Sequence, residues 1–138
     1  MIGYATLGSN DLKRSAAFFD SILSDLGGTR CRTEPNLLGW RFSTGGAELY
    51  VLTPYDGECA QQGNGQMLGL YATTPAIVHS VYEKAIALGA LDEGQPGPRS
   101  YSPGFYAGYF RDPDGNKLNV FCFAEQDQLL PAIKPSEA

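Results

Sequence analysis

The sequence predicts an α+β protein made of two βαβββ modules that form a cupped mixed sheet, with both helices on its outer face. Residues 4–28 and 68–90 each run from an apolar strand through a helix cap and an amphipathic helix to a glycine. Glycine turns at Gly45-Gly46 and Asp114-Gly115 each separate two strand-like segments. A polar, glycine-rich stretch, residues 53–65, separates the two repeats.

Cap residues and apolar spacing define the two predicted helices. Ser9 or Asn10 can cap the first, whose apolar stripe is Leu12, Ala16, Phe19, Leu23 and Leu26, and a glycine pair ends it. Thr74 caps the second, with Pro75 placed where a missing N–H costs nothing, and Gly89 ends it. The stripe of the second helix is Ile77, Val78, Val81, Tyr82, Ala85 and Leu88.

We expect one domain, residues 1–138, because this length suits a single core and one βαβββ unit alone would leave a face of its sheet exposed. Its expected parts are a first module, a linker, a second module and a tail with a short helix near Gln128–Leu130: residues 1–54, 55–65, 66–123 and 124–138. Packing the modules edge to edge would leave a concave inner surface suited to a ligand.

Composition excludes several classes of function. The 43% hydrophobic and 18% charged residues are typical of a folded, soluble chain. A net charge of -5 without a basic run disfavours a nucleic-acid partner. No apolar stretch reaches the length of a membrane span, and the start lacks a secretory signal pattern. Three cysteines without CxxC spacing argue against a disulfide framework and a thiolate zinc site, which favours the cytoplasm.

Three segments carry a family resemblance: "RDPDGNKLNVF" at 111–121, "LGSNDLKRSAAFF" at 7–19 and "GNGQMLGLYA" at 63–72. In this order, with duplicated halves, the chain resembles the vicinal oxygen chelate superfamily. That superfamily includes glyoxalase I, extradiol dioxygenases, fosfomycin-resistance enzymes and bleomycin-resistance proteins. The likeness extends from Met1 to about Phe123 and implies the cupped fold and a homodimer.

The resemblance also implies positions for a metal site. Metal-using members usually carry a His on the opening strand of each half and a Glu after the final hairpin. Those positions hold Tyr4, Met67 and Asn119 here, with Tyr50 as the first-half counterpart of Asn119. Phenols, a thioether and a neutral amide are poor ligands for divalent transition ions. The one histidine, His79, is expected on the outer surface of the second helix. We therefore expect no metal and no other cofactor.

Aromatic residues suggest a binding pocket instead. We expect the pocket to be lined by Tyr4, Trp40, Tyr50, Met67, Tyr71, Tyr101, Tyr106 and Asn119. Alternation along the last strand directs Asn119 into the cup and Leu118 and Val120 toward a helix. The same residues would also suit a filled core, in which the phenols reach water or backbone partners. Asp112 and Asp114 are expected to bond the turn, and Arg111 to anchor the hairpin by an ion pair.

Three functions remain open. The first is a metal-free protein that sequesters or senses a small aromatic or cationic molecule. The second is a related lyase, isomerase or dioxygenase with an atypical metal site, or with acid–base chemistry from Tyr4, Tyr50 or Glu48. We expect Glu48 and Tyr50 to point to opposite faces of the sheet, which argues against acid–base catalysis by the two together. No catalytic residue is predicted. The third is an interaction protein that dimerises through its sheets and binds no ligand.

Overall fold

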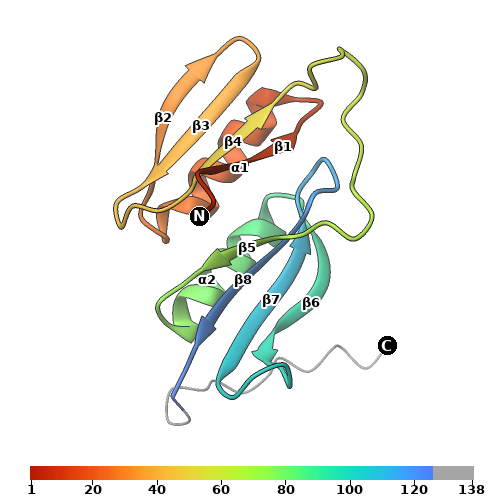
Figure 1. Ribbon diagram of the computed structural model, residues 1–138. Helices are drawn as coiled ribbons and strands as arrows, with labels where there is room; N and C mark the ends of the chain where they lie inside the picture. The colour runs from red at the N-terminus through yellow and green to blue at the C-terminus, as the bar shows by residue number, and fades with distance from the viewer. Residues whose placement is uncertain (126–138) are drawn as a thin grey trace.

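The computed structural model describes residues 1–125 and confirms two βαβββ modules (Figure 1). The first module contains β1 (Tyr4–Gly8), α1 (Leu12–Ser24), β2 (Gly28–Glu34), β3 (Leu37–Phe42) and β4 (Glu48–Leu52). The second contains β5 (Leu68–Tyr71), α2 (Pro75–Ala87), β6 (Leu91–Pro98), β7 (Phe105–Arg111) and β8 (Lys117–Phe123). The short helix expected near Gln128–Leu130 lies outside the described residues.

Each module forms its own four-stranded mixed sheet. The strand orders are β1-β4-β3-β2 and β5-β8-β7-β6, with β1 parallel to β4 and β5 parallel to β8. The other neighbouring strands are antiparallel. Both helices lie behind the sheets in Figure 1, so each sheet has one covered face and one open face. The predicted fold class is confirmed, with two separate sheets rather than one continuous hydrogen-bonded sheet across the described residues.

The helix starts follow capping chemistry, with one change from the prediction. Asp11, rather than Ser9 or Asn10, caps α1, because its Oδ1 accepts the backbone N–H of Arg14 at 3.1 Å. Ser9 supports this turn by accepting the N–H of Asp11 at 3.0 Å. Thr74 caps α2 as predicted, accepting the N–H of residue 77 at 3.2 Å.

The buried faces of the helices lie close to the predicted stripes. On α1 the buried face includes Phe18 and Ile22, which the predicted stripe left out. On α2 the predicted stripe is buried at Val78, Val81, Tyr82 and Ala85 and half-buried at Ile77. Leu88 is exposed, because it caps the helix end rather than facing the sheet. The rings of Phe18 and Phe110 lie 6.4 Å apart between centroids, which joins the cores of the two modules beneath the sheets.

The "RDPDGN" turn between β7 and β8 has two roles. Asp112 bonds the turn as expected, since its Oδ1 accepts the N–H groups of Asp114 and Asn116 at 2.9 and 2.8 Å. Arg111 forms an ion pair with Glu93 on β6, with Nε 2.7 Å from Oε1, and holds the turn by donating from Nη1 to the carbonyl of Gly115 at 2.8 Å. Asn116 donates from Nδ2 to the carbonyl of Gly8 at 2.9 Å, which ties the turn to the first module.

The described helices give no sign of a membrane span: none combines the length and apolarity that crossing a bilayer would require.

Candidate functional site

Side chains on β8 alternate between the two faces of the sheet, as predicted. Leu118, Val120 and Cys122 are fully buried toward α2, whereas Phe121 and Phe123 are on the opposite face with Asn119. The open face, meaning the side of both sheets opposite the helices, therefore carries the candidate ligand contacts.

Tyr4 and Tyr50 meet on the open face of the first sheet. Their ring centroids lie 5.7 Å apart, edge to face, and the guanidinium of Arg32 lies 5.8 Å from the centroid of Tyr50. Gly39 makes room for the Tyr50 ring, because a Cβ at position 39 would lie 2.6 Å from Cε1 of Tyr50. These side chains border an open hollow of about 370 Å³ together with Leu37.

Glu48 lies on the same face as Tyr50, contrary to expectation. The two residues are two positions apart on β4, so alternation directs both to the open face. The Tyr50 hydroxyl donates to Oε1 of Glu48 at 3.1 Å, and Arg41 donates from Nε to Oε2 at 3.1 Å. The hydrogen bond and the negative charge of Glu48 raise the pKa of Arg41.

Tyr71 and Tyr101 belong to an aromatic cluster on the second sheet. We use this name for five rings, each in contact with at least one other: Tyr71, Tyr101, Phe105, Phe121 and Phe123. The centroid of Phe121 lies 5.7 Å from that of Tyr71 and 5.6 Å from that of Phe105. Tyr71 and Phe123 are 60% and 57% exposed. Large apolar side chains gathered on an exposed sheet face are typical of a binding surface.

Trp40 does not reach the open face. It is fully buried, and its Nε1 donates to Oδ1 of Asp20 on α1 at 2.9 Å. Its centroid lies 5.6 Å from that of Phe19, also on α1. Trp40 alternates with Gly39 and Arg41 on β3, and those two occupy the open side. The expectation that Trp40 lines the pocket is therefore corrected: it packs under α1.

Tyr106 is also removed from the expected pocket. Its side chain is fully buried toward α2, where the hydroxyl shares a 2.6 Å hydrogen bond with Nε2 of His79. Burial raises the pKa of the Tyr106 phenol. His79 is thus partly buried against the sheet rather than on the outer surface of α2. The pair has a packing role between α2 and β7.

The four positions aligned with metal ligands lie in three different places. Tyr4 and Tyr50 meet on the first sheet, Met67 borders a hollow between the modules, and Asn119 lies on β8. Within residues 1–125, no group of three or more His, Cys, Asp or Glu side chains is arranged to hold a metal ion. Two phenols, a thioether and an amide do not fit a divalent transition ion.

A cleft between the modules is lined by residues of both sheets. This seam cleft has a volume of about 340 Å³, near the lower end of the roughly 300–1,000 Å³ typical of ligand sites. Its walls are mostly apolar and include, from the two modules, Phe42, Ala47, Glu48, Leu68, Gly69 and Tyr71. Through Tyr71 the cleft adjoins the aromatic cluster, and through Glu48 it adjoins Tyr50.

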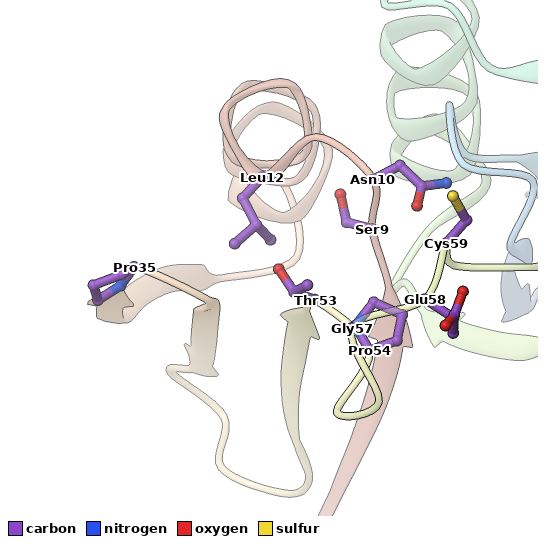
Figure 2. Close-up of a pocket in the computed structure, with 9 residues that line it drawn as sticks. All are labelled: Ser9, Asn10, Leu12, Pro35, Thr53, Pro54, Gly57, Glu58 and Cys59. Atoms are coloured by element: carbon purple, nitrogen blue, oxygen red, sulfur yellow. The ribbon is translucent and has the colours of Figure 1, made fainter.

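Figure 2 shows a further hollow at the start of α1, with Leu12 and Pro35 on one side and Glu58 and Cys59 on the other; its volume is about 350 Å³. Its polar contacts hold the chain that links the modules. Asn10 donates from Nδ2 to the carbonyl of residue 60 at 3.1 Å and accepts the N–H of the same residue at 2.7 Å. We assign this hollow a structural role.

Sequence reasoning missed Gly69, Ala47 and Arg32 as parts of the open face or seam cleft. Arg32 lies near a bulge on β2, where the pairing with β3 shifts between Arg30 and Arg32, so strand alternation gives no simple prediction. For Gly69, the isolated glycine inside a strand was the available signal, because it indicates close approach of another group.

Comparison with known proteins identifies the fold family. The model of the Glyoxalase/Bleomycin resistance protein/Dioxygenase superfamily matches residues 1–120. A glyoxalase/bleomycin resistance protein from Albidiferax ferrireducens T118 is 32% identical, with a TM-score of 0.80 over 88% of this chain and 98% of that chain. No curated protein matches the chain.

Two more distant structures share the fold. A glyoxalase-related enzyme from Fulvimarina pelagi is 20% identical, with a TM-score of 0.71 over 88% of this chain and 87% of that one. Lactoylglutathione lyase from Agrobacterium tumefaciens is 23% identical, with a TM-score of 0.63 over 88% and 92%. Together with the two βαβββ modules, the family match shows that the chain belongs to the Glyoxalase/Bleomycin resistance protein/Dioxygenase superfamily.

Proposed function

We propose that this protein binds a small aromatic molecule in the seam cleft without a transition metal, either to sequester it or to sense it. The observation that carries the proposal is the mostly apolar cleft of about 340 Å³. Tyr71 lines this cleft and also belongs to the exposed aromatic cluster through its contact with Phe121. A flat ring that enters the cleft would remove apolar surface from water on both sides and stack beside Tyr71.

The charges around the open face favour an aromatic ligand over a cationic one. Arg41 pairs with Glu48, and Arg32 pairs with Glu34, so the nearby carboxylates already have cationic partners. A cationic ligand would have to displace a guanidinium. Apolar contact and ring stacking are the interactions that remain available in the cleft.

The absence of metal chemistry is part of the proposal and is supported by the donor set. Tyr4 and Tyr50 offer phenol oxygens where a divalent transition ion prefers imidazole nitrogens and carboxylates. Met67 offers a thioether and Asn119 a neutral carbonyl, which suit such ions poorly. Protein purified without chelators should accordingly contain far less than one equivalent of Ni, Zn, Mn or Fe.

Thermal-shift measurements with phenol, indole and quinoline test the binding function. A compound that binds only the folded state raises the unfolding temperature as its concentration rises. The variant Ala47→Phe places a ring in the cleft wall and should weaken binding at least tenfold. Ala87→Phe, on the exposed end of α2, is the matched control and should bind like the wild type. Equal binding by the two variants would place the ligand elsewhere.

A second candidate function is metal-free acid–base catalysis, and the Tyr50–Glu48 hydrogen bond favours it. Glu48 borders the seam cleft and accepts a hydrogen bond from the Tyr50 hydroxyl at 3.1 Å. A carboxylate and a phenol therefore lie within reach of a molecule bound in the cleft. Lactoylglutathione isomerisation and catechol cleavage assays distinguish this function from simple binding. Turnover that disappears in Glu48→Gln would support an enzyme, and its absence in the wild type would support the binding protein.

Assembly as a homodimer and location in the cytoplasm complete the proposal. Dimerisation rests on family resemblance, and light scattering of purified protein tests it. The cytoplasmic location is supported by three cysteines that are all free thiols, two of them exposed. An exposed thiol would be open to oxidation in a secreted protein, so localisation of a tagged chain is the direct test.

A further inference from the structure

The side chain of Asn119 holds a buried hydrogen-bond acceptor without a partner. Asn119 is 3% exposed, and its Oδ1 is the one buried side-chain oxygen or nitrogen in residues 1–125 that makes no hydrogen bond. An acceptor buried in this way destabilises a fold unless something pairs with it. Such groups are rare in folded proteins and point to a missing partner, such as a water molecule or a ligand.

Gly69 separates this oxygen from the seam cleft. Gly69 on β5 pairs with Asn119 on β8 and also borders the cleft. A Cβ at position 69 would lie 2.9 Å from Oδ1 of Asn119 and 3.3 Å from Cε1 of Phe121. Any other residue at this position would therefore cover the oxygen. Gly69 itself is exposed and has no side chain, so no side chain at position 69 lies between the cleft and the oxygen.

The charged side chain at the cleft, Glu48, already has partners. Glu48 accepts hydrogen bonds from Tyr50 and Arg41, both at 3.1 Å. Asn119 is thus a buried acceptor beside the cleft that a ligand can satisfy without breaking an existing bond. Because the remaining walls are mostly apolar, one hydrogen bond would fix the orientation of a ligand that is otherwise held by apolar contact.

We propose that Oδ1 of Asn119 accepts a hydrogen bond from an N–H or O–H group of the ligand, which reaches it over Gly69. This inference rests on the proposed function and narrows its ligand class to small flat molecules with a hydrogen-bond donor on the ring edge. A site that offers an acceptor discriminates strongly against an analogue lacking the donor, since the acceptor then stays unpaired.

Indole and benzofuran form the test pair, because they have nearly the same shape and differ in a ring N–H against a ring oxygen. Calorimetry on the wild-type protein should give about five- to tenfold tighter binding of indole. In nitrogen-labelled protein, the side-chain amide resonance of Asn119 should shift on addition of indole and stay in place with benzofuran.

Two variants separate the hydrogen bond from the cleft. Asn119→Leu keeps the branched shape of the side chain and removes the acceptor, so the preference for indole should vanish while benzofuran still binds. Gly69→Ala should weaken indole binding by covering the oxygen. Gly3→Ala is the matched control, because a Cβ at Gly3 meets no atom within 4 Å.

The outcomes distinguish the two proposals. Failure of the wild type to bind either compound, or any flat aromatic probe, contradicts the proposed function. Equal binding of both compounds by the wild type, with no shift of the Asn119 amide, overturns the role of Asn119 and leaves the binding function standing; a water molecule would then be the partner of Oδ1. This comparison needs no variant, so it holds even if Asn119→Leu does not fold.

Discussion

Arg14 and Asp114 lie 100 residues apart in the sequence, and Nη2 of Arg14 is 2.8 Å from Oδ1 of Asp114. The Asp114 carboxylate is almost fully buried and also accepts the N–H of Asn10 at 2.9 Å and the hydroxyl of Ser15 at 3.4 Å. Since no strand ladder joins the two sheets in residues 1–125, these contacts and the packing of the helices hold the modules together around the seam cleft.

Replacing Asp114 should therefore destabilise the protein more than replacing Arg14. Asp114→Ala leaves several donors without their acceptor and is expected to lower the free energy of unfolding by about 2–4 kcal/mol. Arg14→Ala should cost under about 1 kcal/mol, because its side chain is 45% exposed. Urea unfolding measures both. Equal losses in the two variants would contradict the dominant role of the buried carboxylate.

The Tyr50 ring depends on the missing side chain of Gly39. Gly39→Ala would place a Cβ 2.6 Å from Cε1 of Tyr50, so the ring must move away from β3. We expect a loss of about 1–3 kcal/mol in the free energy of unfolding and altered aromatic resonances of Tyr4 and Tyr50. Unchanged resonances in Gly39→Ala, judged against Gly3→Ala as the control, would show that the ring does not rest on Gly39.

Acid should weaken the contact between Asp20 and Trp40. Burial acts to raise the pKa of Asp20, but hydrogen bonds from Arg30 and Trp40 and the charge of Arg30 outweigh it and lower the pKa. Because the pKa of Asp20 is lower in the folded state, its ionised form stabilises the fold at pH values above the unfolded-state pKa near 3.8. This stabilisation is lost as the pH falls through the folded-state pKa. Stability should thus decline below about pH 4, with a smaller decline in Asp20→Asn. Fluorescence of Trp40 follows it, and identical declines would contradict the assignment.

Alkaline solution should act on two buried phenols. Burial raises the pKa of Tyr82, and its 2.8 Å hydrogen bond to Asp92 raises it further; burial also raises that of Tyr106. The folded state then keeps protons that the unfolded state releases, so stability is lost as the pH rises above about 10. In an alkaline titration followed by ultraviolet absorbance, two of the eight tyrosines should ionise only when the protein unfolds, as seen by loss of circular dichroism. In Tyr82→Phe only one tyrosine should behave in this way. Ionisation of all eight in the folded protein would refute this.

Much of the fold could be predicted because its signals are local. The cap at Thr74 and the turn at Asp114-Gly115 are short-range choices that the structure keeps. The alternation on β8 also predicted the direction of Asn119, because Leu118 and Val120 on either side are strongly apolar.

The side-chain contents of the site were harder to predict. Trp40 and Tyr106 were expected in the pocket for their aromatic character, although Leu38 and Phe110, which share their strand faces, indicate the helix side. The unpaired oxygen of Asn119 lies beside Gly69, which is fifty residues earlier in the chain. No local sequence pattern could therefore predict this arrangement. Ligand sites that form between modules are set by tertiary packing rather than by local sequence.

Titration of nitrogen-labelled protein with indole in the presence of a strong chelator tests the central claim most directly. We predict saturable shifts of the backbone amides of Ala47, Gly69 and Tyr71, unchanged by the chelator, because apolar contact in the seam cleft holds the ring. Shifts that vanish when the chelator is added, or that map away from these three residues, would contradict a metal-free aromatic site between the modules.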